Sequence, residues 1–332
     1  MTGGRPVVVA CDESGAEGEK LIGGNTVVFA HAGVLLSAEE ASACITRLRE
    51  RIRSPATEYK ATHLLRSKNQ SSLEWFLGPA GPVYGRAHAC LVDKEFFLLG
   101  RFAEALVRAV PEAGLPVGCP SAEAMASALY REGPAVSGRE RWDVFLRLLN
   151  DLMRSPSVRD PRPSPGALLE LAGTLGSLAV RGPVRVALGL LRSHLESPGV
   201  PFPPDPGRDP AAFPSLDPLG TTIGRAIAHW GGAEADVAVV HDQQTSLTDV
   251  RIARIEEVHG CTVRLVSSAS DPRVQIADFL AGVARKLASD ELTRSANPEL
   301  TALLRPYIDP RSIWGDDTSW SRLAPTASAR PR

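Results

Sequence analysis

The sequence has few cysteines, and their arrangement excludes two kinds of chemistry. Five cysteines are spread over 332 residues, and no two of them form a C-x-x-C pair. A disulfide scaffold uses an even set of cysteines, while zinc and dithiol redox sites use closely spaced pairs. We therefore expect reduced, buried thiols.

Long apolar runs are also missing. No window reaches the length of apolar sequence that a membrane span requires, about 20 residues. The first residues, MTGGRP, lead into a strand-like segment without the apolar stretch and small-residue cleavage site of a signal peptide. These absences predict a soluble, cytoplasmic protein with no membrane partner.

An excess of positive or negative charge is missing as well. The formal net charge is -1, so the chain lacks the overall basic field of proteins that coat nucleic acid. Any contact with nucleic acid must come from a local patch. The apolar share of 43% and the charged share of 23% are close to globular averages.

The N-terminal part, residues 1–93, alternates strand and helix signals. Residues 7–11 and 25–36 have the β-branched content of strands. Ser37 and Glu40 have the spacing of a capping box that begins a helix. A polar link, another helix and a further strand follow before residue 94.

The remainder of the chain divides into four parts. Residues 94–197 lose the strand signal and predict a helical insertion. Residues 198–216 are rich in proline, which lacks an N–H donor and fixes φ, so we expect a linker or loop. Residues 217–305 resume the alternation, and residues 306–332 are expected to be a tail. The fold class is therefore α/β: one sheet flanked by helices, with a large helical insertion.

Two predicted strands end in a carboxylate. VVVAC leads into Asp12, and ADVAVVH leads into Asp242. Ligand sites of open α/β sheets gather at the carboxyl ends of strands, so these side chains are neighbours if the strands are adjacent. Asp278 lies beside the apolar stripe of a later helix, where a carboxylate is costly unless it is paired or bound to a metal.

Each of these carboxylates also has a simpler interpretation. Asp12 and Asp242 alone would cap turns, and Asp278 alone would form an ion pair with Arg273 or Arg285 or lie on a solvated helix face. The three positions together favour a shared site.

The chain resembles the domain-of-unknown-function family numbered 3800, whose members have a ribonuclease H-like fold. The segments that carry the resemblance are VACDESG, EYKATHLL, His241-Asp242 and VQIADFLAGVARK. They cover the α/β parts, about half of the chain. The helical insertion and the proline-rich segment match no pattern of the family.

The resemblance implies a ribonuclease H-like mixed sheet on which Asp12, Glu58, Asp242 and Asp278 hold Mg²⁺ or Mn²⁺. Such cations, paired about 3.5 to 4 Å apart, activate water and stabilise the leaving oxygen of a phosphodiester. Lys60 would neutralise the scissile phosphate. The expected function is a nuclease or phosphodiesterase that acts on DNA or RNA.

Several of these assignments have alternatives. Glu13 is the second choice for Asp12, although alternation along a strand directs its side chain to the other face. Glu58 and Lys60 also fit a solvated ion pair of little energetic weight. His31, His63 and His241 are acid–base candidates, but His31 lies in an apolar strand and His241 faces away from Asp242.

Other polar residues have two interpretations each. Gln275 either orients a ligand on the face of Asp278 or is a surface glutamine. Arginines crowd the first helix, where they form a solvated face or contact phosphates; they are Arg47 and Arg51 on one face, and Arg49 and Arg53 on another. LGTTIG lacks the lysine and spacing of a P-loop, and no acyl-transfer triad is evident.

Two other functions remain open at this level. The sheet could serve as a non-catalytic adaptor whose helical insertion binds a protein partner. Alternatively, the carboxylates could hydrolyse a small nucleotide rather than a polymer.

Overall fold

The computed structural model contains two compact units. The sheet unit comprises Met1–Ala16, Val28–Val92 and Pro218–Arg332, and the helical unit comprises Glu17–Val27 and Asp93–Asp217. The residues that the structure describes are 6–53, 59–109, 118–155, 166–178, 182–197, 202–203, 211–231 and 236–325.

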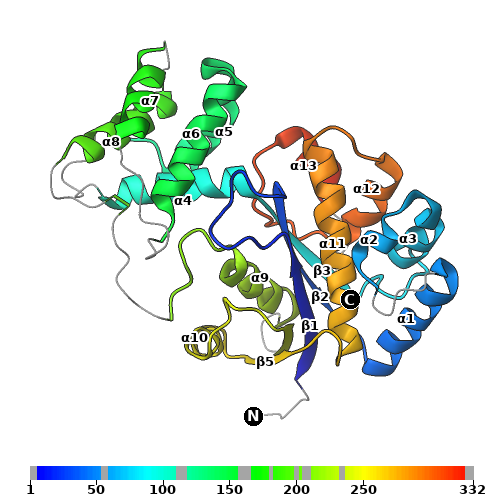
Figure 1. The fold of residues 1–332 in the computed structure, drawn as a ribbon. Coiled ribbons are helices and arrows are strands. Elements are labelled where there is room, and N and C mark those ends of the chain that lie inside the picture. Colours follow the sequence, from blue (N-terminus) through cyan, green and yellow to red (C-terminus); the bar gives the residue numbers. More distant parts are fainter. Residues whose placement is uncertain are drawn as a thin grey trace. The chain divides into compact units, whose positions relative to one another are not determined.

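A five-stranded mixed sheet forms the centre of the sheet unit (Figure 1). The order of its strands is β3-β2-β1-β4-β5. β1 pairs antiparallel with β2 and parallel with β4, which pairs parallel with β5. The α/β class predicted from the sequence is therefore confirmed. The strands are β1 (Val7–Ser14), β2 (Val28–Val34), β3 (Ala87–Asp93), β4 (Val237–Asp242) and β5 (Thr262–Val266).

Side chains on β1 alternate between two buried faces. Ala10 belongs to the apolar core that contains the long helix α11 (Pro272–Leu292). On the other face, a Cβ added to Gly33 would meet the side chains of Val9 and Cys11 and the indole of Trp230. β1 therefore presents its even-numbered residues to α11 and its odd-numbered residues to α9 (Leu219–Gly231).

Helices cover both faces of the sheet. On the α11 face lie α1 (Ala38–Ile52), α2 (Ala61–Leu64), the 3-10 turn η1 (Ser67–Asn69) and α3 (Gln70–Leu77), while α9 covers the other face and contacts α10 (Asp249–His259) (Figure 1). The predicted capping box at the start of α1 is confirmed: the Ser37 hydroxyl accepts from Glu40 N, and Glu40 accepts from Ser37 N. α2 forms within EYKATHLL, which we expect from the sequence to be only a polar link.

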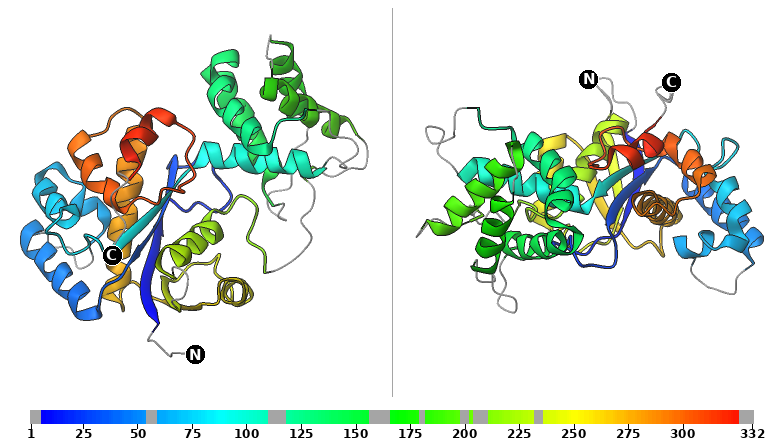
Figure 2. Two further views of the ribbon diagram at one scale, coloured as in Figure 1. Left: turned by 180° about the vertical axis from the view of Figure 1, so that it is seen from behind. Right: turned by 90° about the horizontal axis from the view of Figure 1, so that it is seen from above.

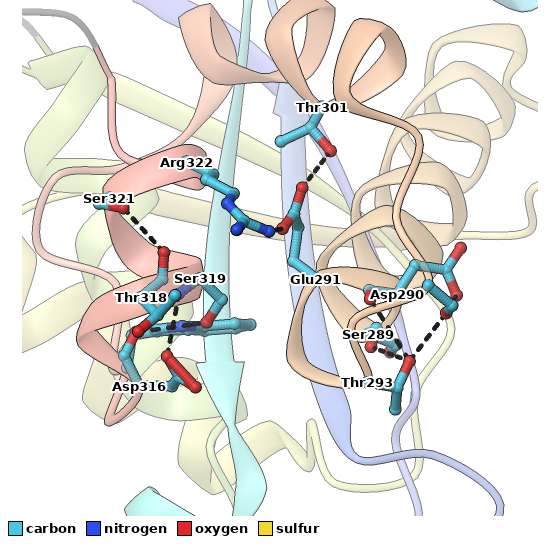
Figure 3. A network of polar contacts seen from close by, with 12 residues as sticks. Ser289, Asp290, Glu291, Thr293, Thr301, Asp316, Thr318, Ser319, Ser321 and Arg322 are labelled. Atoms are coloured by element: carbon cyan, nitrogen blue, oxygen red, sulfur yellow. Dashed lines mark hydrogen bonds and ion pairs between the residues drawn. The ribbon is translucent and has the colours of Figure 1, made fainter.

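The segment after residue 305 is more ordered than the predicted tail. It follows α12 (Pro298–Leu304) and contains the 3-10 turn η3 (Arg305–Tyr307) and α13 (Asp317–Leu323). Glu291 on α11 accepts hydrogen bonds from Thr301 at 2.7 Å and from Arg322 at 3.3 Å (Figure 3). These contacts, together with burial of Leu323, attach residues 306–325 to the sheet unit.

The helical unit contains five helices among its described residues (Figure 2). Glu17–Val27 joins this unit, because Asn150 accepts from Ile22 N at 2.9 Å and donates to Glu19 O at 2.8 Å. Lys94, which is buried, pairs with Glu17 at 2.6 Å. The helices are α4 (Lys94–Ala109), α5 (Ala122–Ser137), α6 (Arg139–Met153), α7 (Gly166–Ser177) and α8 (Gly182–Glu196).

None of the helices in the described ranges combines the length and apolar content that crossing a bilayer would need. Within the proline-rich segment, only residues 202–203 and 211–216 are described.

Candidate functional site

The two strand-end aspartates are neighbours at one edge of the sheet. Strands β1 and β4 run parallel with Cys11 opposite His241, so Asp12 and Asp242 each follow one residue later. Ala10 and Val240 both belong to the core on the α11 face. Because side chains alternate along a strand, Asp12 and Asp242 also lie on that face. The adjacency predicted from the sequence is confirmed.

Asp12 is a buried carboxylate surrounded by other carboxylates. Its side chain accepts a hydrogen bond from Glu13 N at 2.7 Å, and the residue is only 6% exposed. Burial is the main factor that raises the pKa of Asp12 to about 9, and the negative charges of Glu13, Asp278 and Asp242 add to the effect. Asp12 therefore retains a proton at neutral pH unless a cation replaces it.

Asp278 reaches the same face from helix α11. It pairs with Lys60, whose Nζ lies 3.8 Å from Asp278 Oδ2, with the Lys60 side chain 50% and the Asp278 side chain 20% exposed. Lys60 is positioned by α2, which begins at the next residue and packs so closely on α11 that a Cβ on Gly282 would overlap Ala61. The site thus combines three aspartates with one half-exposed ammonium group.

Neighbouring charged groups have their own partners. Arg273, one of the two predicted partners of Asp278, binds Asp271 through two hydrogen bonds of 2.9 and 2.6 Å. Arg285 donates from Nε to Ser14 Oγ at 3.0 Å. Asp242 is oriented by a 2.8 Å hydrogen bond from Ser268 N.

Glu13 lies behind the aspartates, on the α9 face. It is opposite His31 in the register of β1 and β2, and Gln244 donates to its Oε1. Its Oε2 lies 3.8 Å from His241 Nε2 and, within the described residues, has no hydrogen-bond partner. The alternation expected from the sequence is confirmed, because Glu13 and Asp12 occupy opposite faces.

A buried histidine pair accompanies Glu13. The Nε2 atoms of His31 and His241 are 3.2 Å apart, and both residues are fully buried. His241 also contacts its neighbour Asp242 through Nδ1 and the backbone carbonyl at 3.0 Å. Because that carbonyl requires a donor, Nδ1 carries the proton and Nε2 accepts from His31. This pair is separated from the aspartates by the sheet.

The remaining predicted site residues are distributed as follows. Glu58 lies outside the described residues, so its membership of the site stays a prediction. The His63 ring accepts from Lys60 N at 3.1 Å and helps to fix the start of α2. Gln275 is half-buried on α11, and its proposed orienting role stays a prediction.

The donor chemistry of the site suits a hard divalent cation. Asp12, Asp242 and Asp278 supply carboxylate oxygens on one face, and such oxygens are the preferred ligands of Mg²⁺ and Mn²⁺. Glu13 Oε2, which has no hydrogen-bond partner among the described residues, lies on the opposite face of the sheet from these oxygens. Among the described residues, however, no three His, Cys, Asp or Glu side chains are arranged to hold an ion as they stand.

Sequence reasoning did not identify two of the contacts at this edge. Gln244 binds Glu13 across a separation of 231 residues, and Ser268 N binds Asp242 from the loop after β5. Neither contact has a local sequence signal. Comparison of the chain with protein-family models, with curated proteins and with solved structures gives no match.

Proposed function

We propose that the protein hydrolyses phosphodiester bonds with Mg²⁺ or Mn²⁺ held by Asp12, Asp242 and Asp278, with Glu58 as a further ligand. One observation carries the proposal. Carboxylates from three distant segments converge on one face of the sheet, close enough that their charges help to raise the pKa of Asp12 to about 9. Carboxylates crowded in this way are costly without a proton or a cation.

The position of the cluster also supports a ligand site. It lies at the carboxyl ends of the parallel strands β1 and β4, where open α/β sheets bind ligands. A divalent cation bound there would polarise the phosphate and lower the pKa of the attacking water. The ribonuclease H-like assignment belongs to this proposal, with the mixed sheet as its support.

Each residue of the site would have a distinct role in hydrolysis. Asp12, Asp242 and Asp278 bind the cation, and Asp12 releases its proton when it does so. The Ser268 N–H group keeps Asp242 directed toward the site. Lys60, half-exposed and 3.8 Å from Asp278, neutralises a phosphate oxygen as the substrate binds, because its ammonium group is a compact positive charge.

The test is hydrolysis of bis(p-nitrophenyl) phosphate, DNA and RNA in the presence of Mn²⁺. We expect Asp12→Asn and Asp278→Asn to lower the rate at least about 100-fold, the size of effect expected when charge stabilisation is removed from an active site. Asp316→Asn is the matched control, because Asp316 caps α13 through Ser319 N and should leave the rate unchanged.

Two outcomes would overturn the proposal. Equal rates for the wild type and Asp12→Asn would remove the assigned function from this carboxylate. Calorimetric titration that detects no Mn²⁺ binding to the wild type would instead favour the non-catalytic adaptor.

A further inference from the structure

Positive charge is concentrated on one part of the sheet unit. Residues 45–75 contain seven lysines and arginines against three glutamates, a net charge of +4, whereas the whole chain has -1. All seven cationic side chains are exposed. We call this set the α1–α3 basic surface, and it consists of Arg47, Arg49, Arg51, Arg53, Lys60, Arg66 and Lys68.

One aromatic ring, that of Trp75, contacts two of its guanidinium groups. The Cζ atoms of Arg47 and Arg51, one helical turn apart on α1, lie 6.0 and 4.8 Å from the ring centroid of Trp75. Among the described residues, no carboxylate forms an ion pair with either arginine. A cation–π contact restrains a guanidinium group while its N–H donors can still bind an anion. Two pre-oriented donors for an external anion result.

The basic surface continues to the acidic cluster. On the opposite flank of α1, Arg49 lies 5.7 Å from the ring of Tyr59, which in turn lies 5.3 Å from the ring of His63. Lys60, the residue after Tyr59, is 3.8 Å from Asp278. The cations therefore extend from the proposed catalytic carboxylates across both flanks of one helix.

We propose that the α1–α3 basic surface binds the phosphate backbone of a polynucleotide whose scissile bond lies at the acidic cluster. Cations spread over α1 to η1 need phosphates that repeat along a chain, whereas a small nucleotide bound at Asp278 would engage Lys60 alone. Arg47 and Arg51, exposed and without an ion-pair carboxylate among the described residues, serve this purpose, because phosphate contacts supply affinity without sequence readout. The inference rests on the proposed function for the place of cleavage, but binding can be measured without turnover.

The first experiment measures binding in EDTA. Fluorescence anisotropy follows a labelled single strand of about 20 nucleotides over about 50 to 300 mM salt, a range in which phosphate contacts dominate the salt dependence. The double variant Arg47→Gln/Arg51→Gln should reduce the steepness of log K against log salt by about 1.4, because each lost single-strand contact contributes about 0.7.

The matched control is Arg192→Gln/Arg254→Gln. These two arginines are also exposed on helices, but each pairs with a glutamate, Glu196 and Glu257 respectively. We expect the control to leave both affinity and slope at the wild-type values. A second variant, Arg66→Gln/Lys68→Gln, does not involve packing on Trp75 and should also flatten the slope.

The outcomes separate this inference from the proposed function. If Arg47→Gln/Arg51→Gln binds the strand with the wild-type slope and affinity, the basic surface is not the phosphate-binding surface, whatever the protein hydrolyses. If the slope falls but the wild type cleaves neither polymer nor bis(p-nitrophenyl) phosphate, the binding surface stands and the proposed catalysis fails. If the phosphate-binding surface and the proposed catalysis are both correct, Arg47→Gln/Arg51→Gln cleaves the polymer with a raised KM and hydrolyses bis(p-nitrophenyl) phosphate at the wild-type rate.

Discussion

Replacing Asp12 with asparagine should stabilise the metal-free protein at neutral pH. The pKa of Asp12 rises from 3.8 to about 9 in the folded protein, so at pH 7 the folded chain holds a proton that the unfolded chain has released. Each pH unit between the unperturbed pKa of 3.8 and pH 7 is equivalent to about 1.4 kcal/mol. The destabilisation that Asp12 causes at pH 7 therefore has an upper limit of about 4 kcal/mol. Asparagine is neutral in both states and retains the acceptor for Glu13 N. We expect a gain of about 1 to 4 kcal/mol in the free energy of unfolding.

The sign of the pH dependence makes this prediction specific. A carboxyl whose folded pKa is raised favours the folded state only when it is protonated in both states, below about pH 4. Its stabilising contribution is lost as the pH rises from about 4 to about 9. The advantage of Asp12→Asn should therefore be absent near pH 4 and should grow by about 1.4 kcal/mol for each pH unit above it.

Urea unfolding in EDTA at several values between about pH 5 and about pH 8 measures the difference between variant and wild type. Asp271→Asn is the opposite-sign control, because the hydrogen bond from Arg273 lowers the pKa of Asp271. That variant should be less stable than the wild type at neutral pH, with the deficit shrinking on acidification. If Asp12→Asn is no more stable than the wild type at pH 7, or the difference does not change with pH, Asp12 is an ordinary ionised carboxylate.

Two further predictions concern the core around the site. Burial, followed by the neighbouring His241, lowers the pKa of His31 well below 6.5, so the unfolded chain binds more protons in acid and stability should fall below about pH 6.5. His31→Gln should make that decline shallower in urea titrations, and an equally steep decline would contradict this account. Gly282→Ala should lower the free energy of unfolding by about 1 to 3 kcal/mol, because the new Cβ overlaps Ala61. Gly189→Ala on α8, with open space around it, should be neutral or stabilising; similar losses in both variants would argue against the close packing of α2 on α11.

The sequence alone determined the local elements and part of the site. Apolar runs that end in Asp12 and Asp242 define β1 and β4, and Ser37 with Glu40 defines the start of α1. These signals are local, because strand alternation and helix capping depend on residues within a few positions of one another. The expectation that Glu13 faces away from Asp12 followed from the same alternation.

Only the tertiary structure decided which residues meet. The strand order β3-β2-β1-β4-β5 places Asp12 beside Asp242 across a sequence separation of 230, and α2 brings Lys60 to Asp278 rather than leaving that aspartate to Arg273. Local periodicity carries no information about such pairs, because their energies depend on packing between segments distant in sequence. For the same reason, attachment of residues 306–325 to the sheet unit emerged only from contacts such as the one between Glu291 and Arg322.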